Sequence, residues 1–163
     1  MSLSGCTSAY RKSVGGDVQA VYSRYYLTDF NLAWQSVLES LKSARLDVSN
    51  REAGLVQTKW MENTNEKNFV DSFGNSDSYL KAQYRVKITV ARGVYKSKPA
   101  VRVTVMKEQL LQRDVLEGWK AAETDGIDEG TFLYRIGRIV HIKMKLGKME
   151  DEKTKQELES VKF

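Results

Sequence analysis

The chain of 163 residues is long enough for one domain with a sizeable hydrophobic core and short tails. Apolar residues make up 41% of it and charged residues 29%, as in soluble globular proteins, and no run approaches the roughly 20 apolar residues of a membrane-spanning helix. Its net charge of +5 favours weak attraction to anionic surfaces. One histidine and one cysteine offer little from which to build a zinc site or a catalytic triad, so we expect no metal, no cofactor and no enzymatic activity.

Residues 1–18 carry a pattern typical of bacterial lipoproteins. In Leu3-Ser4-Gly5-Cys6, an aliphatic and two small residues precede the only cysteine, which is the order that lipoprotein signal peptidase cleaves. A signal also needs a basic segment and an apolar segment of roughly 7–15 residues, which we expect upstream. The alternative is that the tripeptide Ser4-Gly5-Cys6 arose by chance. Residues 7–18 predict a flexible spacer, and we predict lipid attachment at Cys6.

A strand and a helix are predicted next. Residues 21–27 are rich in tyrosine and valine, which favours a strand. Thr28 and Asp29 supply helix-capping side chains. The apolar residues that follow recur at i, i+4, i+7, i+8 and i+11, the spacing of one helical face. They are Phe30, Trp34, Val37, Leu38 and Leu41.

Four further strands are predicted, as two antiparallel pairs. Residues 46–49 and 55–61 flank a turn that contains glycine, which indicates a hairpin. Residues 84–90 and 101–105 alternate apolar and polar side chains, which indicates half-buried strands. We expect residues 93–99 to connect the second pair, and its second strand to continue toward position 111.

Two polar stretches are predicted to be irregular. Residues 63–78 indicate a long exposed loop in which Phe69 and Phe73 are isolated apolar side chains. Residues 112–128 indicate an irregular connection that contains Trp119. Because isolated aromatic residues in loops are enriched at interfaces, these three are candidate partner contacts. The alternative for Trp119 is that it anchors its loop to the core.

A second long helix is predicted from Asp128, which we expect to cap it, to a stop at Gly147. Its stripe of apolar residues has helical spacing. The charged tail, residues 148–163, is either a solvated helical extension or disordered. The stripe consists of Phe132, Leu133, Ile136, Ile139, Val140 and Met144.

The order of these elements predicts an α+β fold. Strand, helix, two strands, loop, two strands and helix can form a curved antiparallel sheet with two helices packed on one face, the helix-grip arrangement. We expect residues 1–18 to be the leader, residues 19–147 the helix-grip domain and residues 148–163 the charged tail.

Several single residues are candidates for function. Trp34 and Trp60 are expected in the core, although a ligand groove beside the last helix could be lined by Trp60, Ile88 or Ile136. His141 is expected at the surface. Four basic residues at outward strand positions form a solvated face or an anion-binding face. They are Lys59, Arg85, Lys87 and Arg102. Nucleic-acid faces usually interleave exposed aromatic residues, and we expect the strand aromatics to face inward instead.

About thirty residues of the helix and first hairpin resemble the corresponding unit of BamC-type outer-membrane lipoproteins, accessory components of the bacterial β-barrel assembly machine. The matching residues are Ala33-Trp34, Val37, Leu41, Leu46-Asp47-Val48, Arg51, Gly54-Leu55-Val56, Thr58 and Trp60. The resemblance implies a helix-grip fold and a lipid-anchored protein on the periplasmic side of the outer membrane, the membrane that Thr7 after the cysteine also favours. BamC has two such domains, and its main partner-binding segment has no counterpart here.

Three functions follow from these observations. The first is a non-enzymatic scaffold or accessory module that binds other envelope proteins. The second is a periplasmic module that binds a lipid or other hydrophobic ligand between the sheet and the C-terminal helix. The third, if the N-terminal pattern arose by chance, is a basic nucleic-acid-binding domain.

Overall fold

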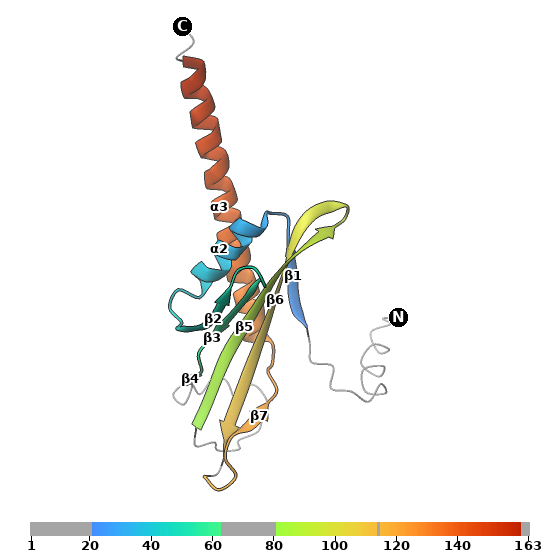
Figure 1. Ribbon diagram of the computed structural model, residues 1–163, viewed down its shortest axis with the longest axis vertical. Helices are drawn as coiled ribbons and strands as arrows, with labels where there is room; N and C mark the ends of the chain where they lie inside the picture. Colours follow the sequence, from blue (N-terminus) through green and yellow to red (C-terminus); the bar gives the residue numbers. More distant parts are fainter. Residues whose placement is uncertain (1–20, 63–80, 114, 161–163) are drawn as a thin grey trace, which may run out of the picture.

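The computed structural model describes residues 21–62, 81–113 and 115–160. These form an α+β domain whose seven strands make one antiparallel sheet (Figure 1). The sheet order is β1-β6-β5-β3-β2, with β4 on β5 and β7 on β6. The strands are β1 (Tyr22–Tyr26), β2 (Leu46–Asn50), β3 (Leu55–Thr58), β4 (Met61–Glu62), β5 (Lys81–Tyr95), β6 (Lys98–Gln112) and β7 (Lys120–Ala122). The helices are α2 (Phe30–Ser40) and α3 (Ile127–Ser160).

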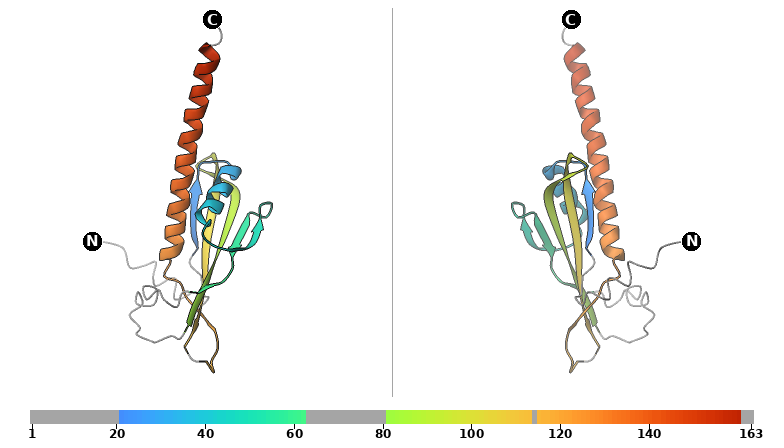
Figure 2. Two further views of the ribbon diagram at one scale, coloured as in Figure 1. Left: turned by 90° about the vertical axis from the view of Figure 1, so that its left-hand side faces the viewer. Right: turned by 90° about the vertical axis from the view of Figure 1, so that its right-hand side faces the viewer.

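Both helices pack on the same face of the sheet and on each other, as the sequence predicts (Figure 2). The strand alternation produces this face, because every second residue of β5 and β6 points toward the helices. Each buried valine or isoleucine contributes about 1.5–3 kcal/mol. The inward strand residues that are almost fully buried are Val56, Val86, Ile88, Val90, Val101, Val103 and Val105.

Helix α2 begins and packs as predicted. The Asp29 side chain accepts a hydrogen bond from the Leu32 amide at 2.9 Å, so it caps the helix. Trp34 and Val37 are buried, and the Trp34 ring stacks on Phe30 with 6.1 Å between ring centroids. Capping at one end and an apolar stripe along one side therefore explain why this short segment is helical.

The hairpin of β2 and β3 is also confirmed, and its turn needs glycine. Gly54 has a φ of +64°, and a Cβ there would lie 2.1 Å from the carbonyl oxygen of Val90. The Gly54 carbonyl accepts a hydrogen bond from the Val90 amide at 2.7 Å. Only a residue without a side chain permits this close approach, which fixes the turn against β5.

Strands β5 and β6 are longer than predicted, with fifteen residues each. The expected connection across residues 93–99 is wrong, because pairing continues to Tyr95 and Lys98. Only Lys96 and Ser97 form the turn, and both have positive φ, 49° and 61°. Two left-handed residues make the tight turn whose twist matches the flanking strands, although neither residue type signals it in the sequence.

Three further expectations were wrong. The polar stretch before α3 contains a strand, β7, which pairs with residues 109–111 of β6. Asp128 does not cap α3, since the helix begins one residue earlier and Asp125 accepts the Ile127 amide at 3.0 Å. The helix also passes through Gly147 and continues to Ser160, so the charged tail is a helical extension up to that residue.

Among the described segments, neither helix combines the length and the apolar character that a membrane-spanning helix needs.

Candidate functional site

The sheet has an open face, which we define as the side turned away from α2 and α3. In the described segments no second layer of helices or strands packs on it (Figure 2). The face mixes polar, aromatic and apolar side chains, most of them half-buried or exposed. Its outward residues are Tyr25, Leu55, Gln57, Gln83, Arg85, Lys87, Thr89, Arg102, Thr104, Met106, Glu108 and Leu110.

Arg85 is held in place at the centre of this face. It lies directly across from Glu108, and its guanidinium forms an ion pair with that carboxylate at 2.6 Å. The guanidinium carbon also lies 4.7 Å from the centre of the Trp60 ring. An arginine that is paired on one side and stacked on an indole has little freedom to lose when a partner binds.

The expectation that Trp60 lies in the core was wrong. Its side chain is 38% exposed and lies beside Arg85, whereas Trp34 is buried as expected. Strand β3 ends at Thr58, and pairing with β5 resumes only at Met61 opposite Tyr84, one residue out of the register that β3 keeps with β5. The two-residue alternation therefore stops before Trp60, and the open face gains an exposed aromatic residue.

The four basic residues that the sequence singles out do not form one continuous cationic surface. Arg85 is paired with an acidic residue, and Lys87 lies opposite Met106 on β6. Arg102 lies further along β6, beside Tyr25 of β1, and Lys59 lies between β3 and β4.

Two tyrosines meet near Arg102. The rings of Tyr25 and Tyr95 stack with 5.3 Å between their centres, and both are exposed. The open face thus carries an aromatic residue beside arginine at two places, around Trp60 and around Tyr25.

Of the other expected site residues, Cys6, Phe69 and Phe73 lie outside the described residues. Trp119 directly precedes β7 and is 41% exposed. Val115 and Leu116 in the same turn are also exposed. Trp119 therefore remains a candidate partner contact.

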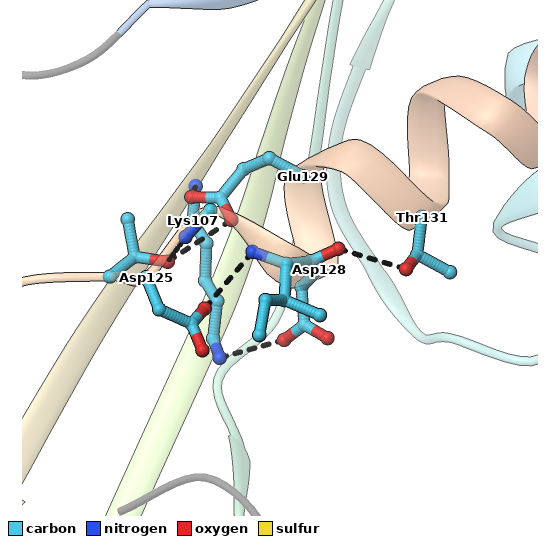
Figure 3. Close-up of polar contacts among 8 residues, drawn as sticks. Lys107, Asp125, Asp128, Glu129 and Thr131 are labelled. Atoms are coloured by element: carbon cyan, nitrogen blue, oxygen red, sulfur yellow. Dashed lines mark hydrogen bonds and ion pairs between the residues drawn. The ribbon is translucent and has the colours of Figure 1, made fainter. Parts of the chain in front are cut away.

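A buried polar cluster that the sequence pattern does not predict joins β6 to the start of α3 (Figure 3). The Lys107 side chain is 1% exposed, and its ammonium donates to Asp128 at 2.7 Å. The same ammonium lies 4.9 Å from the centre of the Tyr84 ring. Burial lowers the pKa of Lys107, and Asp128 opposes that shift.

Glu129 is the second buried charge in this cluster. Its carboxylate accepts the Lys107 backbone amide at 3.3 Å and the Thr124 hydroxyl at 3.0 Å. Burial raises the pKa of Glu129, and these two hydrogen bonds oppose the shift. Because lysine and both carboxylates have partners inside the protein, the cluster locks the first turn of α3 onto β6.

One sequence signal pointed to this cluster. Lys107 follows Val101, Val103 and Val105 at every second position, so the alternation places it inward. A lysine among inward-facing apolar residues needs a carboxylate partner. The alternation does not say which of the acidic residues is the partner; Asp128, at the start of the second helix, meets the lysine only in the folded chain.

A groove of about 380 Å³ opens between the end of α2, the β4 and β5 pair, and the start of α3. Leu41, Met61, Tyr84 and Phe132 give it apolar walls. Trp60, Ile88 and Ile136, the residues expected to line a groove, do not line this one, and Ile88 and Ile136 are fully buried in the core. The polar residues of the wall are Ser40, Ser43, Asp128, Thr131 and Arg135.

A shallower groove of about 400 Å³ runs between β1 and the outer side of α3. Arg24 and Arg138 contribute two basic side chains to its lining, beside Tyr134, His141 and Ile142. His141 is exposed there, as expected.

Within the described segments, no three acidic, histidine or cysteine side chains are grouped so as to hold a metal ion. No protein-family model and no curated protein matches the chain.

Proposed function

We propose that this protein is a non-enzymatic, protein-binding accessory module of the bacterial outer membrane, anchored by lipid on Cys6 and facing the periplasm. The open face of the sheet carries the proposal. It combines tryptophan, tyrosine and arginine with half-buried leucine and methionine, the mixture found at protein interfaces. The resemblance of residues 33–60 to BamC-type lipoproteins supports the same role.

The energetic centre of such an interface would be Trp60 with Arg85. The indole offers a large apolar surface, and the ion pair with Glu108 already fixes the guanidinium that lies over it. A partner that covers this pair pays little side-chain entropy. Removing such an anchor commonly costs 2 kcal/mol or more of binding free energy.

Site-specific photo-crosslinking in intact bacterial envelopes tests the partner surface. A photo-reactive residue at position 102 or 106, on the open face, should join the protein to one or a few defined envelope proteins. The same residue at position 42, exposed beyond α2, is the control and should not. The Trp60→Ala substitution should reduce the adducts at position 106. Equal, diffuse labelling from both sides of the sheet would argue against a specific interface.

The lipid anchor has a separate test. The natural gene, with whatever precedes residue 1, should incorporate a clickable fatty acid into the protein, and Cys6→Ser should abolish the label. Acyl chains provide about 0.8 kcal/mol per buried CH₂, so the same substitution should move the protein from the membrane to the soluble fraction. A wild-type protein without label would refute the anchor and leave the binding face untouched.

The groove beside α2 supports a second candidate, binding of a hydrophobic ligand. Its apolar walls and the charged Asp128 and Arg135 suit an amphiphile. A fluorescent fatty acid should bind the full chain, and the Ala44→Trp substitution, which fills the groove, should weaken that binding. Binding unaffected by this substitution would exclude the groove as the site.

A further inference from the structure

The second half of α3 leaves the domain (Figure 2). The helix has 34 residues, about 51 Å of length, and its buried contacts with the sheet end at Val140. Lys143 makes one further contact, an ion pair with Glu39 of α2 at 3.0 Å. Beyond it the helix extends away from the other described elements.

An apolar stripe runs along this projecting segment. The side chains of Ile142, Leu146 and Met149 are 49%, 52% and 55% exposed. Their spacing of four and then three residues is that of a coiled-coil seam. At 100° per residue, the stripe lies about 130° around the helix from Ile136 and Val140, which face the sheet. It therefore belongs to a side of α3 that the domain does not use.

The projecting segment is poorly suited to stand alone. Isolated helices are marginal in water, and an interior glycine such as Gly147 costs about 1 kcal/mol. Its last turns carry Glu157 and Glu159 and end without a basic residue, which opposes the helix dipole. A partner helix would compensate for both.

Charge along α3 is strongly segregated. Between Glu129 and Glu150 the sequence has no acidic residue but has five basic ones. From Glu150 to Glu159 it has five acidic residues and two lysines. A helix with one basic half and one acidic half is complementary to a second copy that runs in the opposite direction.

We propose that the projecting half of α3 is a homodimerisation element in which two copies pair as an antiparallel coiled coil. In this arrangement Leu146 packs against Met149 of the second copy. The heptad repeat then determines which side chains beside the apolar seam face each other across the two helices. Lys145 then faces Glu152 of the second copy, and Lys143, which also pairs with Glu39 of its own chain, lies beside Glu150 of the second copy. Two-fold symmetry repeats each attractive contact.

The parallel arrangement is disfavoured by the same sequence. It would place Arg138 beside Lys143 of the second copy, and Glu152 beside its Glu157, so that like charges meet at two levels. Only Lys145 would meet an opposite charge, on Glu150. The antiparallel arrangement has no like-charged flanking pair over these positions.

The basic groove between β1 and α3 extends the antiparallel surface. Arg138 belongs to its wall together with Arg24 and His141. The same register brings Glu159 of the second copy opposite Arg138. The acidic end of one helix thus lies along the basic groove of the other copy, which adds charge complementarity beyond the apolar stripe.

Sedimentation of the full chain tests the dimer. The wild type should show a reversible monomer–dimer equilibrium, and Leu146→Asp should shift it to monomer. Lys145→Glu and Glu152→Lys should each weaken association about tenfold, because each replaces two attractive contacts with repulsive ones. The double variant should restore it. Lys148→Glu, on another side of the helix, is the matched control and should change nothing.

Spin labels test the orientation. A label at position 159, in a Cys6→Ser background, should give an inter-copy separation of at least about 30 Å in the antiparallel dimer and below about 20 Å in a parallel one. A wild-type chain that stays monomeric up to about 0.5 mM, a dimer that survives Leu146→Asp, or a short label distance would each overturn the proposal.

Discussion

The two halves of α3 belong to one continuous helix but are stabilised by different things. The first half packs Leu133, Ile136 and Val140 into the core and is tied to β6 through Lys107. The second half makes few contacts with the domain and exposes an apolar stripe. The two halves of a single long helix can therefore differ in stability, because tertiary packing stabilises the first half and only local helix propensity stabilises the second.

The largest difference between the halves should come from deleting an apolar side chain. Ile136→Ala should lower the free energy of unfolding by about 3–4 kcal/mol, because it leaves a cavity in a packed core. Leu146→Ala should change it by less than about 0.5 kcal/mol in monomeric protein. Urea unfolding at low protein concentration measures both, and similar losses would refute the division.

The buried ion pair gives the next largest effect. Lys107→Met should cost about 2–3 kcal/mol of unfolding free energy, since it leaves the Asp128 and Glu129 carboxylates without their cation. Lys148→Met, the control on the projecting half, should stay within about 0.5 kcal/mol of wild type. Thermal or urea unfolding decides this, and a neutral Lys107→Met would show that the pair does not hold α3.

Two glycines of α3 should respond to alanine with opposite signs. A Cβ at position 137 would lie 3.1 Å from the Tyr26 ring, which cannot easily move because its hydroxyl donates to the Leu133 carbonyl at 2.5 Å. Gly137→Ala should therefore destabilise the protein by about 0.5–1 kcal/mol. No described atom lies within 4 Å of a Cβ at position 147. There alanine should stabilise the helix by up to about 1 kcal/mol, seen as slower amide exchange after that residue.

The smallest expected effect is on the pH dependence. Because burial raises the pKa of Glu129 above its ordinary value of 4.5, the folded state holds this proton more tightly than the unfolded state. Glu129 therefore lowers stability progressively as the pH rises from below 4.5 through its folded pKa. Relative to Glu129→Gln, the wild type should lose stability across that interval and remain constant above it. Unfolding of both proteins from pH 3.5 to 7.5 measures the difference, and parallel curves would contradict the shift.

Much of the fold could be predicted from the sequence, because periodicity is a local property that burial imposes. The stripe of α2, its Asp29 cap and the alternation in β5 and β6 all identified their elements. The turn at Lys96 and Ser97 could not be predicted, since neither residue is typical of positive φ. Strand β7 was not predicted, because so short a segment becomes a strand only by pairing with β6.

The candidate site was predicted less well. The outward positions of Arg85, Lys87 and Arg102 follow from strand alternation, but their neighbours do not. That Glu108 neutralises Arg85 depends on the register of β5 against β6, and that Trp60 joins the open face depends on where β3 ends. Both are tertiary facts that no local pattern encodes.

By itself, the sequence determined the fold class, both helices and the inward side of each main strand, because burying apolar side chains requires a period of two or 3.6 residues. The tertiary structure alone decided which charges meet. It brought Lys107 to Asp128 across 21 residues and Arg85 to Glu108 across 23. It also left the stripe of Ile142, Leu146 and Met149 outside the core. Contacts between distant segments depend on strand register and helix placement, which the whole chain sets together.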